Sequence, residues 1–268
     1  MDQIRIYNHC AHARMDPRLA PVVESVRAEM VACCGDRLRE LRLQGSIARG
    51  DARVGHADLD MIALLAGPPT ASDHGCLEEL AERLGAGTNL VSRFDLEAVD
   101  ANTLTPFRRF VLSSDSLCIH GTDSLTLPVQ SMERLALARL VTPDPATMLP
   151  DYLDWVEELP SAEDAERRFA SRIIGKDLLK VLRGVLLLRG AEYEVAIPRV
   201  AAQVPQVAPE ASAVTERLFA LYIEPTPDLD AIHRAVAEVV ALMKDCPELG
   251  MLCGANSDDI ASLGETTT

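Results

Sequence analysis

The pattern of hydrophobic and polar positions predicts mixed helices and strands in the first half of the chain. Apolar residues recur at helical spacing over 17–34 and again over 73–86, which indicates two amphipathic helices. Short apolar runs at 38–44 and just after position 60 predict two strands, and the alternation within 89–99 predicts another. A helix and a short strand are expected over 107–123. This order of elements is typical of an α+β domain.

The second half of the chain is predicted to be mostly helical. Proline-containing segments at 142–145 and 149–150 indicate a linker and a turn. We therefore expect two domains, 1–141 and 142–268, the second an all-α bundle. Its helices are predicted over 152–159, 162–189, 198–207, 210–223 and 228–244.

Both ends of the chain are polar. His9, Cys10 and His12 lie close together, but they lack the second half of a metal site, so we expect residues 1–16 to form a flexible arm. The polar segment 256–268 is expected to fray.

The segment from Gly45 to Asp60 carries the candidate chemistry. It follows a predicted strand, opens with Gly45-Ser46 and a short helical run, and ends with Asp58-Leu59-Asp60 at the head of the next strand. Glycine lets the backbone approach a phosphate closely, and a neighbouring hydroxyl and N–H groups can hold anionic oxygens. Asp58 and Asp60 share one face of a strand, where they repel each other unless a cation lies between them. Such oxygen ligands suit Mg²⁺ or Mn²⁺.

Together these features resemble the polymerase-β-like nucleotidyltransferase superfamily, whose mark is h-G-[GS] followed by [DE]-h-[DE]. The run GSIARGDA resembles the minimal and the aminoglycoside-nucleotidyltransferase-like types. The resemblance covers about residues 22–125. It implies a mixed sheet with flanking helices, followed by a helical domain that forms one wall of a substrate cleft.

The same resemblance implies a reaction and a role for each candidate residue. NMP, most simply AMP from ATP, passes to a hydroxyl of a small molecule such as an aminoglycoside, and pyrophosphate leaves. Gly45 and Ser46 bind the nucleotide, and Asp58 and Asp60 hold Mg²⁺ or Mn²⁺. Antibiotic resistance is the expected biological setting.

The resemblance also implies a third carboxylate from a neighbouring strand. Phe94, Leu96 and Ala98 alternate with Arg93, Asp95 and Glu97, which places Asp95 and Glu97 on one face. Asp95 fits the pattern h-D-h as a third metal ligand, and Glu97 is the alternative. Either could act as the base that deprotonates the acceptor.

Basic residues that could contact phosphate are less clearly marked. Arg49 could bind phosphate or hold its loop through Asp51, and Ile47 stands where many relatives have an arginine. Lys176 and Lys180 lie one helical turn apart, and one of them could reach the triphosphate. The alternative for both lysines is an ordinary solvated helix face.

Charge and cysteine content limit the partners. The formal net charge of −15 over 268 residues argues against broad nucleic-acid binding and suits a cationic acceptor, although acidity also keeps proteins soluble. Seven cysteines without CxxC spacing favour reduced thiols and a cytoplasmic location. No signal peptide or membrane span is predicted.

Two other functions remain open. A nucleotidyltransferase could modify a macromolecule instead, such as a toxin protein or the 3′ end of a tRNA. A nucleotide-binding protein without catalysis is the third hypothesis. The substrate cleft could lie within one chain or across a homodimer.

Overall fold

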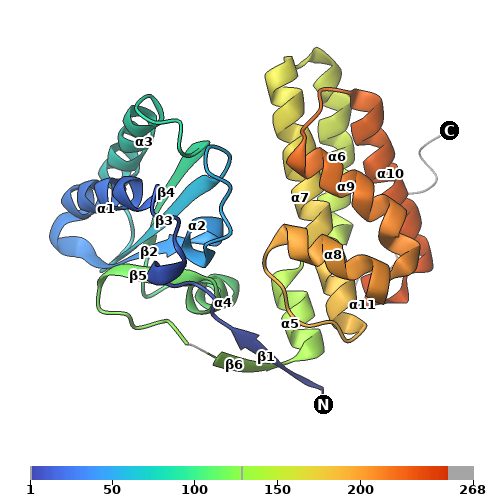
Figure 1. The fold of residues 1–268 in the computed structure, drawn as a ribbon, viewed down its shortest axis with the longest axis horizontal. Helices are drawn as coiled ribbons and strands as arrows, with labels where there is room; N and C mark the ends of the chain where they lie inside the picture. The colour runs from blue at the N-terminus through green and yellow to red at the C-terminus, as the bar shows by residue number, and fades with distance from the viewer. Residues whose placement is uncertain (1, 128, 253–268) are drawn as a thin grey trace. The chain divides into compact units, whose positions relative to one another are not determined.

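The computed structural model describes residues 2–127 and 129–252, which fall into two compact units (Figure 1). One unit comprises Arg5–Ser131, and the other comprises Met132 onward together with the first residues up to Ile4. The first 131 residues contain these elements: β1 (Gln3–Tyr7), η1 (His12–Arg14), α1 (Ala20–Cys34), η2 (Gly35–Arg37), β2 (Leu38–Gln44), α2 (Gly45–Arg49), β3 (Asp58–Leu65), α3 (Ala71–Gly85), β4 (Arg93–Asp100), α4 (Pro106–Ser114) and β5 (Ser116–Gly121).

A four-stranded mixed sheet in the order β4-β3-β2-β5 forms the centre of the first unit. β2 runs antiparallel to both β3 and β5, whereas β4 pairs with β3 in parallel after the α3 crossover. The predicted mixed sheet with flanking helices is confirmed. The third predicted strand begins at Arg93 rather than at position 89.

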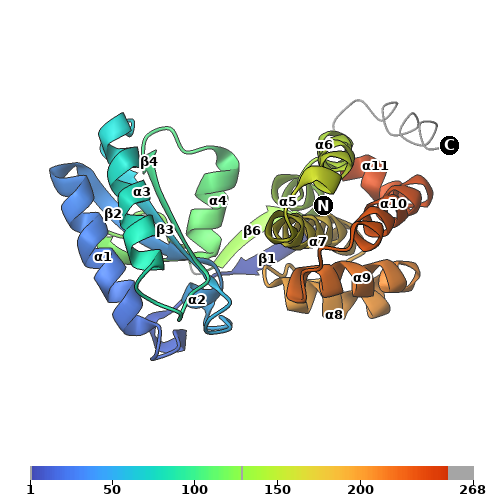
Figure 2. The same cartoon turned by 90° about the horizontal axis from the view of Figure 1, so that it is seen from above.

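The two faces of this sheet differ in how they are covered (Figure 2). α1 and α3 pack on one face, where Leu41, Leu43, Leu59 and Met61 are fully buried in the main core. α4 lies on the other face, where Leu112 packs on Ile62 and Leu64 in a smaller cluster. Because strand side chains alternate, Asp58 and Asp60 point to this second face.

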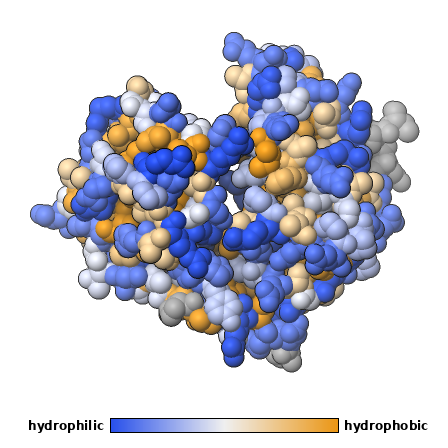
Figure 3. Space-filling view, in the orientation of Figure 1, coloured by the Kyte–Doolittle hydropathy of each residue, from blue (hydrophilic) through white to orange (hydrophobic). Residues whose placement is uncertain are grey.

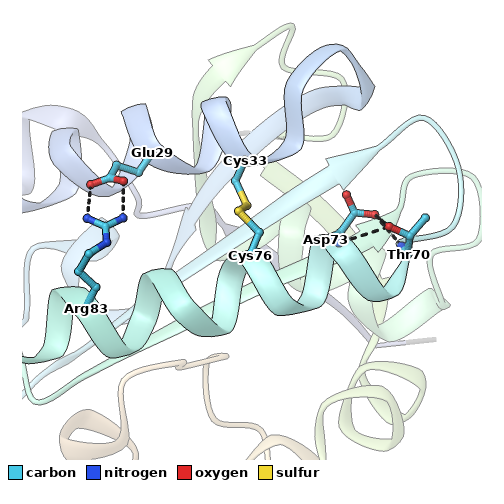
Figure 4. Close-up of a disulfide and its surroundings, with 6 residues drawn as sticks. All are labelled: Glu29, Cys33, Thr70, Asp73, Cys76 and Arg83. Carbon is cyan, nitrogen blue, oxygen red and sulfur yellow. Dashed lines mark hydrogen bonds and ion pairs between the residues drawn. A yellow bond between two sulfur atoms is a disulfide. The ribbon is translucent and has the colours of Figure 1, made fainter.

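A disulfide between Cys33 and Cys76 joins α1 to α3 (Figure 4). Their Cα atoms are 6.2 Å apart, and the ion pair between Glu29 and Arg83 links the same two helices. The prediction that all thiols are reduced is therefore wrong for this pair. Sequence spacing could not identify it, because the partners are 43 residues apart and meet only once both helices pack on the sheet.

The start of the chain is ordered, so the predicted flexible arm is wrong. β1 pairs with β6 (Val129–Glu133) in a separate two-stranded sheet, and Ile4 and Ile6 are buried. Further along, the N–H of Ala11 donates to the carbonyl of Ala48 at 3.1 Å. Alternating apolar residues and this docking on α2 order the segment, and no metal cluster of His9, Cys10 and His12 forms among the described residues.

The second unit is helical, as expected. Helices α6, α7, α9 and α10 pack against one another, and α8 packs on α7 and α9 (Figure 1). Among residues 2–127 and 129–252, no helix is long and apolar enough to cross a membrane. The elements are α5 (Arg134–Val141), α6 (Pro145–Glu158), η3 (Leu159–Ser161), α7 (Asp164–Leu188), α8 (Ile197–Val207), η4 (Pro209–Ala211), α9 (Ser212–Ile223), α10 (Leu229–Asp245) and α11 (Pro247–Leu252).

Two boundaries differ from the prediction. The units divide at Ser131 rather than at 141, because α5 packs on α7 and Arg134 donates to the carbonyls of Leu187 and Ala191. The predicted turn at 149–150 lies within α6, which Asp144 caps and which tolerates Pro150 in its second turn. The expectation of a frayed tail at 256–268 lies outside the described residues.

Hydrophilic side chains dominate the visible surface of each unit, with smaller hydrophobic patches between them (Figure 3). The acidic run on α6, formed by Asp151, Asp154, Glu157 and Glu158, is exposed.

Candidate active site

The turn between β2 and α2 brings the backbone against one of the predicted carboxylates. Gly45 has φ +75°, a conformation that favours glycine. A Cβ at this position would lie 2.7 Å from Oδ2 of Asp60. Glycine is therefore required here for two separate reasons, the backbone conformation and the close approach of Asp60. Ser46 follows it and is partly exposed.

The strand register gathers carboxylates on the less covered face of the sheet. Gln44 on β2 is the direct partner of Asp60 on β3, and Asp60 is the direct partner of Asp95 on β4. Asp58 shares their face, and its Oδ1 accepts a hydrogen bond of 2.6 Å from the Ser92 hydroxyl. Asp58, Asp60 and Asp95 thus come together beside Gly45, as the motif predicts.

Glu97 lies two residues further along β4, on the same face as Asp95. Its direct partner is Ile62 rather than an aspartate, and it forms an ion pair of 2.6 Å with Arg108 of α4. Asp95 is instead paired with Arg93 at 2.5 Å. Of the two alternatives for the third carboxylate, Asp95 is therefore the one level with Asp60.

These residues fit a divalent cation by their chemistry. Hard carboxylate oxygens from adjacent positions are the ligands that Mg²⁺ and Mn²⁺ prefer, and three of them repel one another without a cation. The glycine at position 45 lets the Asp60 carboxylate approach the backbone more closely than any other residue would allow.

A surface hollow of about 320 Å³ is lined by Asp60 and Asp95 and by residues of the edge strand β4 and of α3. Ile62 contributes an apolar side chain to its lining, and Gln44 contributes a neutral amide next to Asp60. The residues that line it are Gln44, Asp60, Ile62, Leu77, Glu78, Ala81, Phe94, Asp95, Leu96 and Glu97.

Arg49 holds its own helix in place rather than facing solvent. Its Nη1 contacts both carboxylate oxygens of Asp115, at 2.8 and 2.7 Å, and its Nε contacts Asp51 at 3.2 Å. Burial lowers the pKa of Arg49, but these two carboxylates outweigh burial and the pKa is raised. Of the two predicted roles of Arg49, the structure contains the ion pair with Asp51. It adds Asp115, which the sequence did not indicate.

The neighbouring position, Ile47, is fully buried in the main core. Its side chain therefore packs where relatives are expected to carry an arginine, and it supplies no charge to the site.

Lys176 and Lys180 belong to α7 of the helical unit. Lys180 pairs with Asp177 at 2.6 Å, and the Tyr152 hydroxyl donates to the same carboxylate at 2.6 Å. Burial lowers the pKa of Lys180, and Asp177 opposes that effect. A role of either lysine in nucleotide binding stays a prediction.

Comparison with known proteins gives likeness in structure only. No family model and no curated protein matches the sequence. A spectinomycin adenyltransferase AAD(9) from Enterococcus faecialis, solved with ATP and spectinomycin, is 12% identical with a TM-score of 0.49. The match covers 82% of this chain and 98% of that one. A toxin–antitoxin solved with AMP-PNP is 19% identical, with a TM-score of 0.29, over 37% of this chain and 74% of that one. A protein from Shewanella oneidensis is 17% identical, with a TM-score of 0.26, over 38% and 71%.

The mixed sheet, the Gly45-Ser46 turn and the aspartates on adjacent strands are arranged as the family resemblance implies. The chain thus combines an α+β unit built on this sheet with a helical unit, as the sequence predicted.

Proposed function

We propose that this nucleotidyltransferase-like protein transfers a nucleoside monophosphate, AMP as the first candidate, from an NTP to a hydroxyl of a small molecule. The observation that carries the proposal is the set of three aspartates, Asp58, Asp60 and Asp95, beside the Gly45-Ser46 turn. The NTP phosphates dock at this turn, where the absence of a Cβ admits them.

The carboxylates of Asp58, Asp60 and Asp95 would hold Mg²⁺ or Mn²⁺. When bound, the metal stabilises negative charge on the phosphoryl oxygens. The acceptor oxygen forms a bond to the α-phosphorus, and the bond from the α-phosphorus to the α–β bridging oxygen breaks. The acceptor proton passes to a carboxylate, for which Asp95 and Glu97 are the candidates, and pyrophosphate takes the electron pair of the broken bond.

The acceptor is expected to be a hydroxylated molecule with a positive charge, such as an aminoglycoside. The acidic lining of the hollow at Asp60, Glu78, Asp95 and Glu97 and the net charge of −15 support this choice. In this proposal the protein acts on a small molecule in the cytoplasm, and the modification confers antibiotic resistance.

The experiment follows the label of α-³²P NTPs with Mg²⁺ against aminoglycosides, spectinomycin, bulk tRNA and a cell lysate. The variants are Asp58→Ala and Asp60→Ala, with Asp100→Asn at the far end of β4 as the matched control. Label on a small molecule that requires both aspartates and survives Asp100→Asn supports the proposal. Label on RNA or protein moves the function to macromolecule modification. A folded protein that releases no pyrophosphate with any acceptor contradicts it.

A further inference from the structure

The carboxylate cluster contains its own positive charge, Arg93. The Nη2 atom of Arg93 lies 2.5 Å from Oδ2 of Asp95, and Arg93 is the direct partner of Asp58 on the adjacent strand. Burial lowers the pKa of Arg93, but the ion pair with Asp95 and the charges of Asp58 and Asp60 outweigh it and raise the pKa. All three aspartates therefore act electrostatically on this one guanidinium.

Other basic side chains near the site are engaged elsewhere. Arg49 is bound to Asp115 and Asp51, and Arg108 is bound to Glu97. The position after Ser46 carries the buried Ile47. One guanidinium cannot neutralise three carboxylates, so an excess of negative charge remains for a cation to balance.

The ion pair of Arg93 is partly exposed to solvent, unlike that of a buried structural arginine. The side chain of Arg93 is 50% exposed and that of Asp95 is 38% exposed. Exposed pairs of this kind are weak, so a competing cation can separate them at low cost. Once separated, a guanidinium binds phosphate oxygens in a bidentate manner.

We propose that Arg93 is the resident counter-charge of the Asp58–Asp60–Asp95 cluster and exchanges partners during nucleotide binding. Without metal, it pairs with Asp95. When a divalent cation enters, Arg93 releases Asp95 and binds the polyphosphate of the nucleotide, which supplies the charge that Ile47 lacks. The inference rests on the proposed function and extends it to a residue that contacts substrate.

The test measures Mn²⁺ binding by electron paramagnetic resonance, and then binding of α,β-methylene-ATP with saturating Mn²⁺ by calorimetry. The α–β bridge of this analogue cannot be broken in the proposed reaction. Replacing Arg93 by Gln removes the competitor, so Mn²⁺ alone should bind about two- to fivefold more tightly, as expected for an exposed ion pair. The same change should weaken binding of the analogue by roughly fivefold or more, because a charge-assisted contact to phosphate is lost. A purely structural role of Arg93 would not shift the two affinities in opposite directions.

Arg108→Gln is the matched control, because Arg108 pairs with the other carboxylate of β4 at similar exposure. It should change neither affinity. Arg93→Lys keeps the charge but loses the bidentate geometry, so its affinities should lie between those of wild type and Arg93→Gln. Circular dichroism verifies that each variant is folded.

The outcomes separate the two proposals. If Mn²⁺ binding depends on Asp60 but its affinity is unchanged in Arg93→Gln, the role of Arg93 is overturned and the proposed function still stands. Opposite shifts caused by Arg108→Gln instead would assign the role to Arg108 and the third carboxylate to Glu97, and would also overturn the inference. If neither wild type nor Arg93→Gln binds Mn²⁺ through Asp60, both proposals fall.

Discussion

The same face of the sheet carries two clusters of charged residues that are built in opposite ways. At one end, Arg42 of β2 is fully buried and satisfied by contacts from Ser116 at 2.8 Å, Glu40 at 2.6 Å and Asp123 at 3.0 Å. At the other end, Asp58, Asp60 and Asp95 share the half-exposed Arg93. The two clusters lie only two residues apart along the strands, because Arg42 pairs with Ile62 and Gln44 pairs with Asp60.

The difference distinguishes a structural cluster, around Arg42, from the proposed binding cluster of Asp58, Asp60 and Asp95. Glu40 also accepts a hydrogen bond of 3.1 Å from the Ser124 N–H, so the segment after β5 is held onto the sheet. Glu40, Cys118 and Asp123 lie close enough to hold a metal, but the guanidinium of Arg42 already contacts both carboxylates. Acidic groups that lie close together are therefore not sufficient evidence for a cation site. A site is favoured where several carboxylates lie on an exposed face of the sheet and nearby basic side chains do not balance their negative charge.

The largest expected effect is on activity and lies in the exposed cluster of Asp58, Asp60 and Asp95. Asp60→Asn should lower the rate of pyrophosphate release by roughly 10³-fold or more, because the proposed metal ligand next to the proposed phosphate site is lost. Its melting temperature should stay equal or rise, since repulsion among the three carboxylates decreases. Enzyme assay and thermal unfolding measure the two effects. Retention of a tenth of the rate by a folded variant would remove Asp60 from the site.

In the buried cluster around Arg42, the large effect should be on stability. Arg42→Met leaves Glu40 buried without its ion partner and should cost about 3–5 kcal/mol of unfolding free energy. Arg108→Met removes an exposed pair and should cost less than about 1 kcal/mol. Urea unfolding of both variants makes the comparison. Equal losses of unfolding free energy in the two variants would show that the buried cluster around Arg42 contributes no more to stability than the exposed pair of Arg108 and Glu97.

The turn at Gly45 connects stability with the open cluster. Gly45→Ala should cost roughly 1–2 kcal/mol through its left-handed backbone, and it should also weaken Mn²⁺ binding because the new Cβ displaces Asp60. Gly35→Ala is the control, since Gly35 has φ +53° and no atom within 4 Å of the added Cβ. Calorimetric titration of Mn²⁺ distinguishes them. An equal change in affinity in both variants would exclude the displacement of Asp60 as the cause.

The smallest effect should be a pH dependence of the stability that Asp123 contributes to the buried cluster around Arg42. Burial raises the pKa of Asp123, but hydrogen bonds from Thr126 and Arg42 outweigh burial and lower it. Asp123 therefore contributes stability above its unfolded pKa of about 3.9, and this contribution is lost as the pH falls through the lowered value. The stability difference between wild type and Asp123→Asn, measured by urea unfolding from pH 6 to pH 3, should shrink as the pH falls. A difference that grows toward pH 3 would contradict this sign.

Local sequence patterns were enough to predict the elements around the candidate site and the carboxylates that they carry. The strand before Gly45, the short helix after it and the strand that begins at Asp58 all follow from patterns only a few residues long. Period-two alternation likewise put Asp95 and Glu97 on one face before any fold was considered. Such features are predictable because neighbouring residues decide them.

Which distant residues meet depended instead on how the elements pack in three dimensions. The parallel pairing of β4 with β3 made Asp95, rather than Glu97, the direct partner of Asp60. Packing also joined Arg49 to Asp115, 66 residues away, and Cys33 to Cys76. It turned the expected arm into β1, whose partner β6 lies more than a hundred residues later. No local period encodes these contacts, because they depend on how whole elements bury their apolar faces against one another.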